Sequence, residues 1–252
     1  MTDSLLRHIA IIMDGNNRWA KQRSLSGIAG HREGVERIRD VMAACQELGV
    51  EVLTLFAFSS ENWKRPAREV DALMSLFQVY LKKEARLLKK RGVRLKVVGS
   101  RERFSKALNS AIVAAEQLTN VPEAKTTLVI AADYGGRWDI AQAAARLAEA
   151  VASGHLQASE IDEHRFAEYT SLAGLPELDL LIRTGGEHRI SNFVLWQAAY
   201  AELYFSPALW PDFNGDMLKA AADNFYQRQR RFGRTAEQCA EPSLGQGGSS
   251  HA

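Results

Sequence analysis

Short apolar runs alternate with longer amphipathic stretches along most of the chain. Several of the runs are apolar at consecutive positions and rich in β-branched or aromatic residues, a pattern typical of parallel strands covered on both faces. The runs that predict strands cover residues 8–13, 51–58, 94–99, 126–133, 178–183 and 201–206.

The stretches between these runs repeat apolar residues at helical spacing. They predict helices over residues 34–48, 66–91, 105–118, 138–153 and 216–232. Pro66 suits the first turn of its helix, and Gly154 closes the fourth helix. Because strand and helix alternate, we expect one α/β domain, with a mainly parallel six-stranded sheet flanked by helices, over residues 1–240. Residues 241–252 are expected to form a disordered tail.

Composition and charge argue against nucleic-acid-binding, disulfide-rich and membrane-spanning proteins. The chain has 252 residues, 46% of them hydrophobic, and its 32 basic and 30 acidic residues leave a formal charge of only +2. A nearly balanced charge gives the whole molecule no strong positive potential, so we do not expect nucleic acid as a partner. Cys45 and Cys239 are too few and too far apart for a disulfide framework or a CxxC metal site. No apolar run reaches the roughly 20 residues of a membrane span, and no cleavable leader is evident, so we expect a cytoplasmic protein.

Polar segments follow four of the predicted strands, at the edge where open parallel sheets bind ligands. They read DGNNRW, SSENWKRP, YGGRWD and TGGEHRISNF, after the first, second, fourth and fifth strands. Arginine binds phosphate through a planar fork, and glycine lets backbone N–H groups approach an anion. The segments together predict a polyphosphate site, although each alone also suits an ordinary loop.

Asp14 opens the first of these segments and has two interpretations. It either caps a following helix or binds a hard cation, since Mg²⁺ takes one or two carboxylates and completes its shell with phosphate and water. The chain has no GxxxxGK[ST] and no GxGxxG after the first strand. ATPase and dinucleotide-binding functions therefore lose their main support.

Six segments resemble the cis-prenyltransferase family, and within it the bacterial undecaprenyl diphosphate synthases. They are HIAIIMDGNNRWA, GHREG, LTLFAFSSENWKRP, YGGRWDI and IRTGGEHRISNFVLWQAAYAELYF followed by LWPDF, in the family's order over residues 8–213. The resemblance implies a homodimer with an apolar tunnel and Mg²⁺-dependent addition of isopentenyl diphosphate to farnesyl diphosphate. The implied product is undecaprenyl diphosphate, a lipid carrier precursor for peptidoglycan and other cell-wall polysaccharides, with weak peripheral membrane association for its release.

The resemblance also implies roles for individual residues. Asp14 is the essential carboxylate and a Mg²⁺ ligand, Glu202 is a second acid associated with the metal, and Asn62 assists proton removal. The residues implied to bind or contact the allylic diphosphate are Gly15, Asn16, Asn17, Arg18, Trp19 and His31. Those implied to close over the reacting centre are Ser59, Ser60, Glu61, Asn62, Trp63 and Arg65. Those implied to form the isopentenyl diphosphate pocket are Arg183, Arg189, Ile190 and Ser191.

Three positions depart from the family's usual pattern. Asn17 stands where many relatives have Gly, and Asp133 stands where Asn is usual. Gly27 replaces an Arg that binds phosphate in well-known relatives. Losing a charged hydrogen bond there weakens a pocket by roughly 1.5–3 kcal/mol, unless a neighbour such as Arg23 compensates. None of the three removes a presumed catalytic group.

Other interpretations remain open from the sequence. Trp19 and Trp63 are also typical of core or rim aromatics, and Arg65 of a solvated charge. The helical positions Val70, Leu73, Leu76 and Phe77 suit a core as well as a tunnel wall. Two further functions are a non-catalytic partner subunit of a prenyltransferase complex and a cis-prenyl synthase of different product length. A trans-type synthase is disfavoured because the chain has no DDxxD segment.

Overall fold

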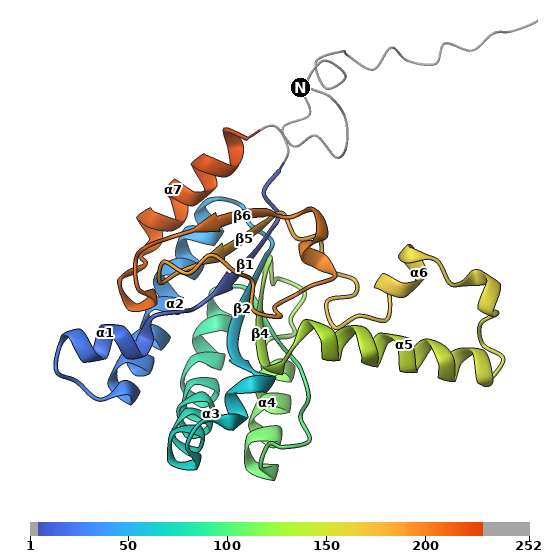
Figure 1. Cartoon of the computed structure of the whole chain (residues 1–252), viewed down its shortest axis with the longest axis horizontal. Coiled ribbons are helices and arrows are strands. Elements are labelled where there is room, and N and C mark those ends of the chain that lie inside the picture. The colour runs from blue at the N-terminus through green and yellow to red at the C-terminus, as the bar shows by residue number, and fades with distance from the viewer. Residues whose placement is uncertain (1–4, 229–252) are drawn as a thin grey trace, which may run out of the picture.

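Six parallel strands form one sheet at the centre of the molecule (Figure 1). The computed structural model describes residues 5–228. The strands lie in the order β3-β4-β2-β1-β5-β6, and every neighbouring pair is parallel. Their bounds are β1 (His8–Ile12), β2 (Val52–Ser59), β3 (Val93–Val98), β4 (Thr126–Tyr134), β5 (Leu180–Arg183) and β6 (Glu202–Phe205). The predicted α/β class and the six-stranded parallel sheet are confirmed.

The strand order places a topological switch between β1 and β5. Ile11 of β1 lies opposite Leu55 of β2 on one side and Ile182 of β5 on the other. From β1 the chain continues to β2 on one side, whereas from β5 it continues to β6 on the other. The loops after β1 and β5 therefore diverge, which opens a crevice at the carboxyl ends of these strands.

The two faces of the sheet are covered differently. Ile9 and Ile11 point to one face and Ala10 and Ile12 to the other, as the two-residue period of a strand requires. The first face packs in a large core against α2 (Gly27–Glu47), α3 (Ala67–Lys90), α4 (Lys106–Thr119) and α7 (Gly215–Tyr226). The second face packs against Trp138 of α5 (Gly136–Ala152) and irregular segments that include Leu172 and Phe193. Burial on both faces explains why β1 is apolar from Ile9 to Ile12.

Several helix boundaries differ from the prediction. α2 begins seven residues early, at Gly27, where the Ser26 side chain accepts a hydrogen bond from the Ala29 N–H at 3.3 Å. Two short helices, α1 (Asn16–Gln22) and α6 (Glu163–Ala167), were not predicted, because they bury too few residues to create an apolar period. Pro66 is the N-cap of α3 rather than part of its first turn.

The remaining expectations fall partly outside the structure. Gly154 follows α5 with φ +73°, as expected of a helix end. Cys45 is buried in the main core.

Within residues 5–228, no helix has both the length and the apolar character needed to span a membrane. Residues 229–232 of the last predicted helix, Cys239, the domain limit at 240 and the tail at 241–252 lie outside the described residues.

Candidate active site

Asp14 lies two residues after β1, at the crevice between β1 and β5. Its backbone carbonyl accepts hydrogen bonds from Thr184 Oγ1 at 2.7 Å and from the Trp210 N–H at 2.9 Å. Its carboxylate contacts two guanidinium groups, Arg183 Nη2 at 2.9 Å and Arg18 Nη2 at 3.2 Å. Because the N-cap of α1 is Gly15 and no side chain caps this helix, the structure does not support the capping interpretation of Asp14.

Arg183 ends β5 and is almost fully buried. Its Nη1 donates to the Arg189 carbonyl and to Ser191 Oγ, both at 2.7 Å. Its Nε is buried and has no hydrogen-bond partner among residues 5–228. Arg18 adds a second positive charge and donates to the Gly185 carbonyl at 2.7 Å. Two arginines around one carboxylate leave a net positive charge, which favours an anionic ligand.

Two glycines allow these groups to approach each other. Gly15 has φ +110°, and a Cβ there would lie 2.8 Å from Leu209 Cδ2. Gly185 has φ +88°, and a Cβ there would lie 2.5 Å from Arg18 Nη2. A side chain at either position would therefore strain the backbone and displace the loop beside Asp14.

Asn16 and His31 leave buried polar atoms without partners beside Asp14. Asn16 donates to the Met13 carbonyl at 3.1 Å, but its Oδ1 has no partner in the described part of the chain, and neither has His31 Nε2. Burial, reinforced by the positive charge of Arg65, lowers the pKa of His31 to about 4. The imidazole is therefore neutral near pH 7. Since buried polar atoms are normally paired, these two atoms point to a polar ligand.

The segment after β2 forms the opposite rim of the site. The 3-10 helix η1 (Ser60–Lys64) begins where the Ser59 N–H donates to Asn62 Oδ1 at 3.0 Å. Glu61 accepts from Asn192 Nδ2 at 2.9 Å and from Ser60 Oγ at 3.2 Å. The first of these bonds ties η1 to the loop after β5. The structure thus brings Ser59, Glu61 and Asn62 to the same crevice as Asp14.

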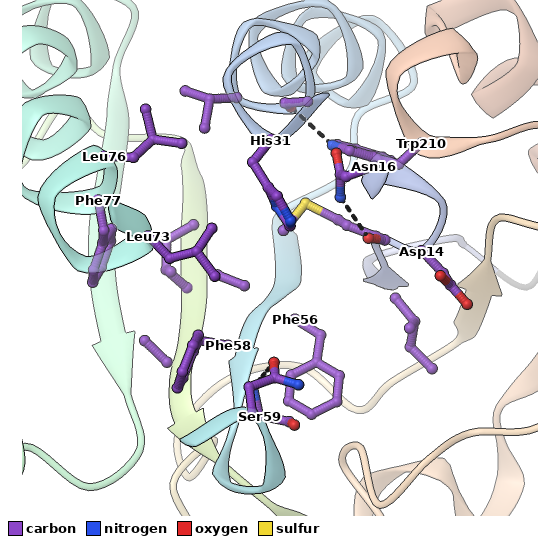
Figure 2. A pocket seen from close by; sticks show the side chains of 18 of the residues that line it. Asp14, Asn16, His31, Phe56, Phe58, Ser59, Leu73, Leu76, Phe77 and Trp210 are labelled. Carbon is purple, nitrogen blue, oxygen red and sulfur yellow. Dashed lines mark hydrogen bonds between the residues drawn. The ribbon is translucent and has the colours of Figure 1, made fainter. Parts of the chain in front are cut away.

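A cavity of about 580 Å³ extends from these polar groups between α2 and α3. Leu73, Leu76 and Phe77 line its α3 side, and Figure 2 shows them across the space from Asp14 and His31. Val70, the fourth candidate of the predicted tunnel wall, is buried but does not line the cavity. The cavity is apolar inside and charged at its mouth. It therefore suits an amphipathic ligand with an anionic head.

Other predicted residues lie at the margin of the site. Trp19 donates from Nε1 to Asp212 at 2.7 Å and stacks under Arg23. Arg65 lines the cavity but pairs with Glu69 at 2.9 Å. Ser60 lies beside Glu61 at the rim, Arg189 is exposed and pairs with Glu187, and Ile190 packs against the second face of the sheet.

Asn17 and Gly27, which both depart from the family's usual pattern, are neighbours. A Cβ at Gly27 would lie 2.5 Å from Asn17 Oδ1, so the Asn17 side chain occupies space that a residue larger than glycine would need. Arg23 binds Trp19 and Asp212 instead of reaching the gap left at Gly27. Arg23, the neighbour considered as a replacement for the missing arginine, is therefore engaged elsewhere.

Glu202 is not brought to Asp14 within the chain. It opens β6 opposite Leu180, three residues before the level of Arg183, or roughly 10 Å along the strand at the usual rise. Its carboxylate instead pairs with Arg228 at 2.9 Å. Among residues 5–228, no group of three or more His, Cys, Asp or Glu side chains is arranged to hold a metal ion. A role of Glu202 as a metal ligand stays a prediction, and it requires a second subunit.

Trp210 and Asn192 also shape the site, although neither was among the residues expected there. Trp210 lines the cavity and donates from Nε1 to the Gly34 carbonyl at 2.8 Å. Asn192 adopts φ +62° and connects Glu61 to the N-terminus of α5 through the Arg137 N–H. Both residues belong to segments, LWPDF and SNF, that the sequence already marked as motifs. Their contacts with Gly34 and Glu61 join distant parts of the chain, however, and residue spacing does not predict such contacts.

Several known proteins are similar to this chain in both sequence and fold. A family model described as "Putative undecaprenyl diphosphate synthase" matches residues 12–233. A farnesyl-diphosphate-specific ditrans,polycis-undecaprenyl-diphosphate synthase of Pseudomonas aeruginosa is 56% identical over 232 residues, which are 92% of each chain. A Vibrio cholerae protein of the same name is 51% identical over 94% of each chain.

A solved structure agrees with these sequence matches. Lavandulyl diphosphate synthase from Lavandula x intermedia, solved with dimethylallyl diphosphate, has a TM-score of 0.87 and 36% identity. The match covers 90% of this chain and 98% of that one. The matches extend over nearly the whole of the described fold and include the crevice at β1 and β5. This chain therefore belongs to the undecaprenyl diphosphate synthase family of cis-prenyltransferases.

Proposed function

We propose that this protein elongates farnesyl diphosphate with isopentenyl diphosphate, one cis unit at a time, and makes undecaprenyl diphosphate. The observation that carries the proposal is the continuity between the arginine-lined mouth and the apolar cavity. A prenyl diphosphate has the same division into an anionic head and an apolar chain. The names of the Pseudomonas and Vibrio relatives support the choice of substrate and product.

The polar groups divide into two sets around Asp14. Asn16 and His31 line the cavity, and Arg18 pairs with Asp14 at its mouth. These three residues would bind the allylic diphosphate, whose chain would lie inside the cavity. Arg183 and Ser191 are joined to each other on the β5 side and would bind isopentenyl diphosphate, with the more exposed Arg189 at the rim. Directed cationic donors stabilise the negative charge that develops on a leaving diphosphate.

The reaction breaks the allylic carbon–oxygen bond, forms a carbon–carbon bond and removes one proton. Asn62 is placed at the rim, but its amide is a poor base and its Oδ1 already accepts the Ser59 N–H. We therefore assign Asn62 to orienting the substrate, and the proton to a diphosphate oxygen.

Asp14 and the phosphate-binding groups around it suit a Mg²⁺ ion that is shared between the protein and its substrate. The half-buried Asp14 offers a single hard carboxylate next to groups that bind phosphate. Mg²⁺ is commonly held by one or two carboxylates together with substrate phosphates and water. When bound, the ion would neutralise charge on the diphosphate leaving group.

A homodimer is part of the proposal. β6 is an edge strand, and Leu203 within it and Tyr200 just before it are exposed large side chains. Unpaired edges with exposed apolar residues are typical contact surfaces between subunits. A contact between subunits at β6 would also place Glu202 near the interface, from which it could reach the active site of the partner subunit.

Turnover by the purified protein tests the function directly. Farnesyl and isopentenyl diphosphates with Mg²⁺ should give a product with the mass of undecaprenyl diphosphate, and exhaustive chelation should stop its formation until Mg²⁺ is restored. A shorter or longer product would support a cis-prenyl synthase of different product length. No product from the protein alone would support the non-catalytic partner subunit.

A further inference from the structure

Asp133 is a buried acid that the proposed reaction does not use. It lies near the end of β4 with φ +52°, a left-handed conformation that is uncommon for residues other than glycine. Its carboxylate is fully enclosed and is bound by both arms of one guanidinium, Arg103 Nε at 3.1 Å and Nη2 at 2.5 Å. A buried carboxylate in a bidentate pair fixes the position of its arginine.

Arg103 uses its other surface to hold an aromatic ring. Its guanidinium carbon lies 4.7 Å from the centre of the Trp63 ring. Trp63 also meets Phe58 edge-on at 5.2 Å and Phe104 at 6.4 Å. Three side chains thus surround the indole, and its Nε1 is buried without a partner among the described residues. Packing and the cation–π contact, rather than a hydrogen bond, therefore hold Trp63 in place.

Trp63 belongs to η1 and directly follows Asn62. Phe58, Ser59, Glu61 and Asn62 line the cavity, whereas Asp133, Arg103 and Trp63 do not. η1 is thus held at two points. Glu61 is bound by Asn192 on the side of β5, and Trp63 is held by Arg103 on the side of β3 and β4.

We propose that Asp133 and Arg103 are positioning residues that act through Trp63 to hold η1, and with it Asn62, at the reacting centre. Without the bidentate pair, the guanidinium is free to rotate off the ring, and one of the two attachments of η1 is lost. A small displacement of a positioning group lowers turnover strongly, by up to about 10²-fold for roughly 1 Å. The kinetic part of this inference rests on the proposed function, but the hydrogen-exchange part does not.

Arg103→Met is the main test, and Arg101→Met is its matched control. Both arginines leave the same segment between β3 and α4, and both pair with an acid. Arg101, however, binds Glu116 and the Val97 carbonyl, whereas the guanidinium that lies over Trp63 is that of Arg103. We expect Arg103→Met to lower kcat roughly tenfold and to speed amide hydrogen exchange over residues 59–65. Arg101→Met should change neither.

Asp133→Asn and Arg103→Lys extend the test. Asp133→Asn introduces the residue that is usual in the family, keeps the shape of the side chain and leaves one acceptor oxygen for Arg103. It should move kcat and hydrogen exchange in the same direction as Arg103→Met, but by less. Arg103→Lys retains the charge but not the planar fork, and should rescue only part of the loss. If Asp133→Asn fails to fold, the two substitutions of Arg103 still test the inference, because this half-exposed residue tolerates replacement better than the buried Asp133.

Two outcomes would overturn the inference. One is an Arg103→Met protein with wild-type kcat and unchanged exchange over residues 59–65. The other is an equal effect of Arg101→Met, which would mean that the segment is merely structural. Absence of turnover in the wild-type protein would instead refute the proposed function, and the exchange experiment would still test the attachment of η1.

Discussion

Buried polar side chains lie near both ends of β1, but they differ in how fully they are paired. At the amino end, His8 bonds through Nδ1 to the Pro176 carbonyl at 2.9 Å and through Nε2 to Thr54 Oγ1 at 2.8 Å. Asp179 there accepts the backbone N–H groups of Arg7 and His8. At the carboxyl end, atoms of Asn16, His31 and Arg183 stay without partners among residues 5–228.

The two histidines make the contrast clear. Burial lowers the pKa of both His8 and His31 to about 4, so their charge states do not distinguish them. What differs is the number of bonded ring nitrogens. Both ring nitrogens of His8 are bonded, which indicates a structural role, whereas Nε2 of His31, which has no partner among the described residues, lies in the wall of the cavity beside Asp14 and is available to a ligand.

Removing one acid from each end should have opposite consequences. Asp14→Ala should lower turnover by at least about 10³-fold because it removes the proposed metal ligand, while the protein stays folded. Asp179→Ala should cost about 1–3 kcal/mol of stability, since the buried N–H of His8 and the partly buried N–H of Arg7 lose their acceptor, but should spare kcat of the folded protein. Circular dichroism melts and steady-state turnover measure both. Near-normal turnover of a folded Asp14→Ala protein would contradict the site.

The two arginines of the isopentenyl diphosphate pocket should differ in importance. Arg183→Met should raise KM for isopentenyl diphosphate roughly ten- to a hundredfold, as expected for a lost charged hydrogen bond in a buried setting. Arg189→Met should have a smaller effect because Arg189 is exposed and already pairs with Glu187. Both changes should affect farnesyl diphosphate less. Equal losses for the two substrates would contradict the division of the pocket.

The two histidines should respond differently to a ligand. Each is neutral in the folded protein and charges more readily when unfolded, so each contributes stability that is complete above about pH 6.5 and is lost as pH falls towards 4. Bound inorganic diphosphate should raise the pKa of His31, because negative charge beside the imidazole favours its cation, and should leave His8 unchanged. Ring-proton NMR titrations with and without diphosphate measure this. Equal shifts would remove the distinction between the two ends.

Glu202 tests whether the amino end of the sheet contributes to a site across a dimer. In a hybrid of Asp14→Ala and Glu202→Ala subunits, action across the interface leaves one intact site and one with both lesions. About half of wild-type activity per hybrid should then return if the sites are independent. Mass or differential tags establish that the hybrid has formed. A hybrid as inactive as its parents would refute the shared site and leave Asp14 unaffected.

Apolar runs were sufficient to predict the sheet, because burial on both faces leaves a strong local pattern in β1, β2 and β4. α1 was missed because Ala20 is its only buried residue, which leaves no apolar period in the sequence. Asp14 and Arg183 were found through their motifs. The separation of Glu202 from Asp14 depends on the register of β6, and the attachment of Trp63 by Arg103 depends on contacts between distant segments. Neither leaves a periodic trace in the sequence.

The ion pair between Asp14 and Arg183 joins residues 169 positions apart and bridges two adjacent strands. Contacts of such long separation carry a high loop-closure cost and form slowly compared with local ones. The strand β1 is made first, yet it cannot complete its pairing until β5 has been synthesised. We therefore expect the site to assemble late in folding, so that recovery of diphosphate binding during refolding reports the docking of β5 rather than the initial collapse of the chain.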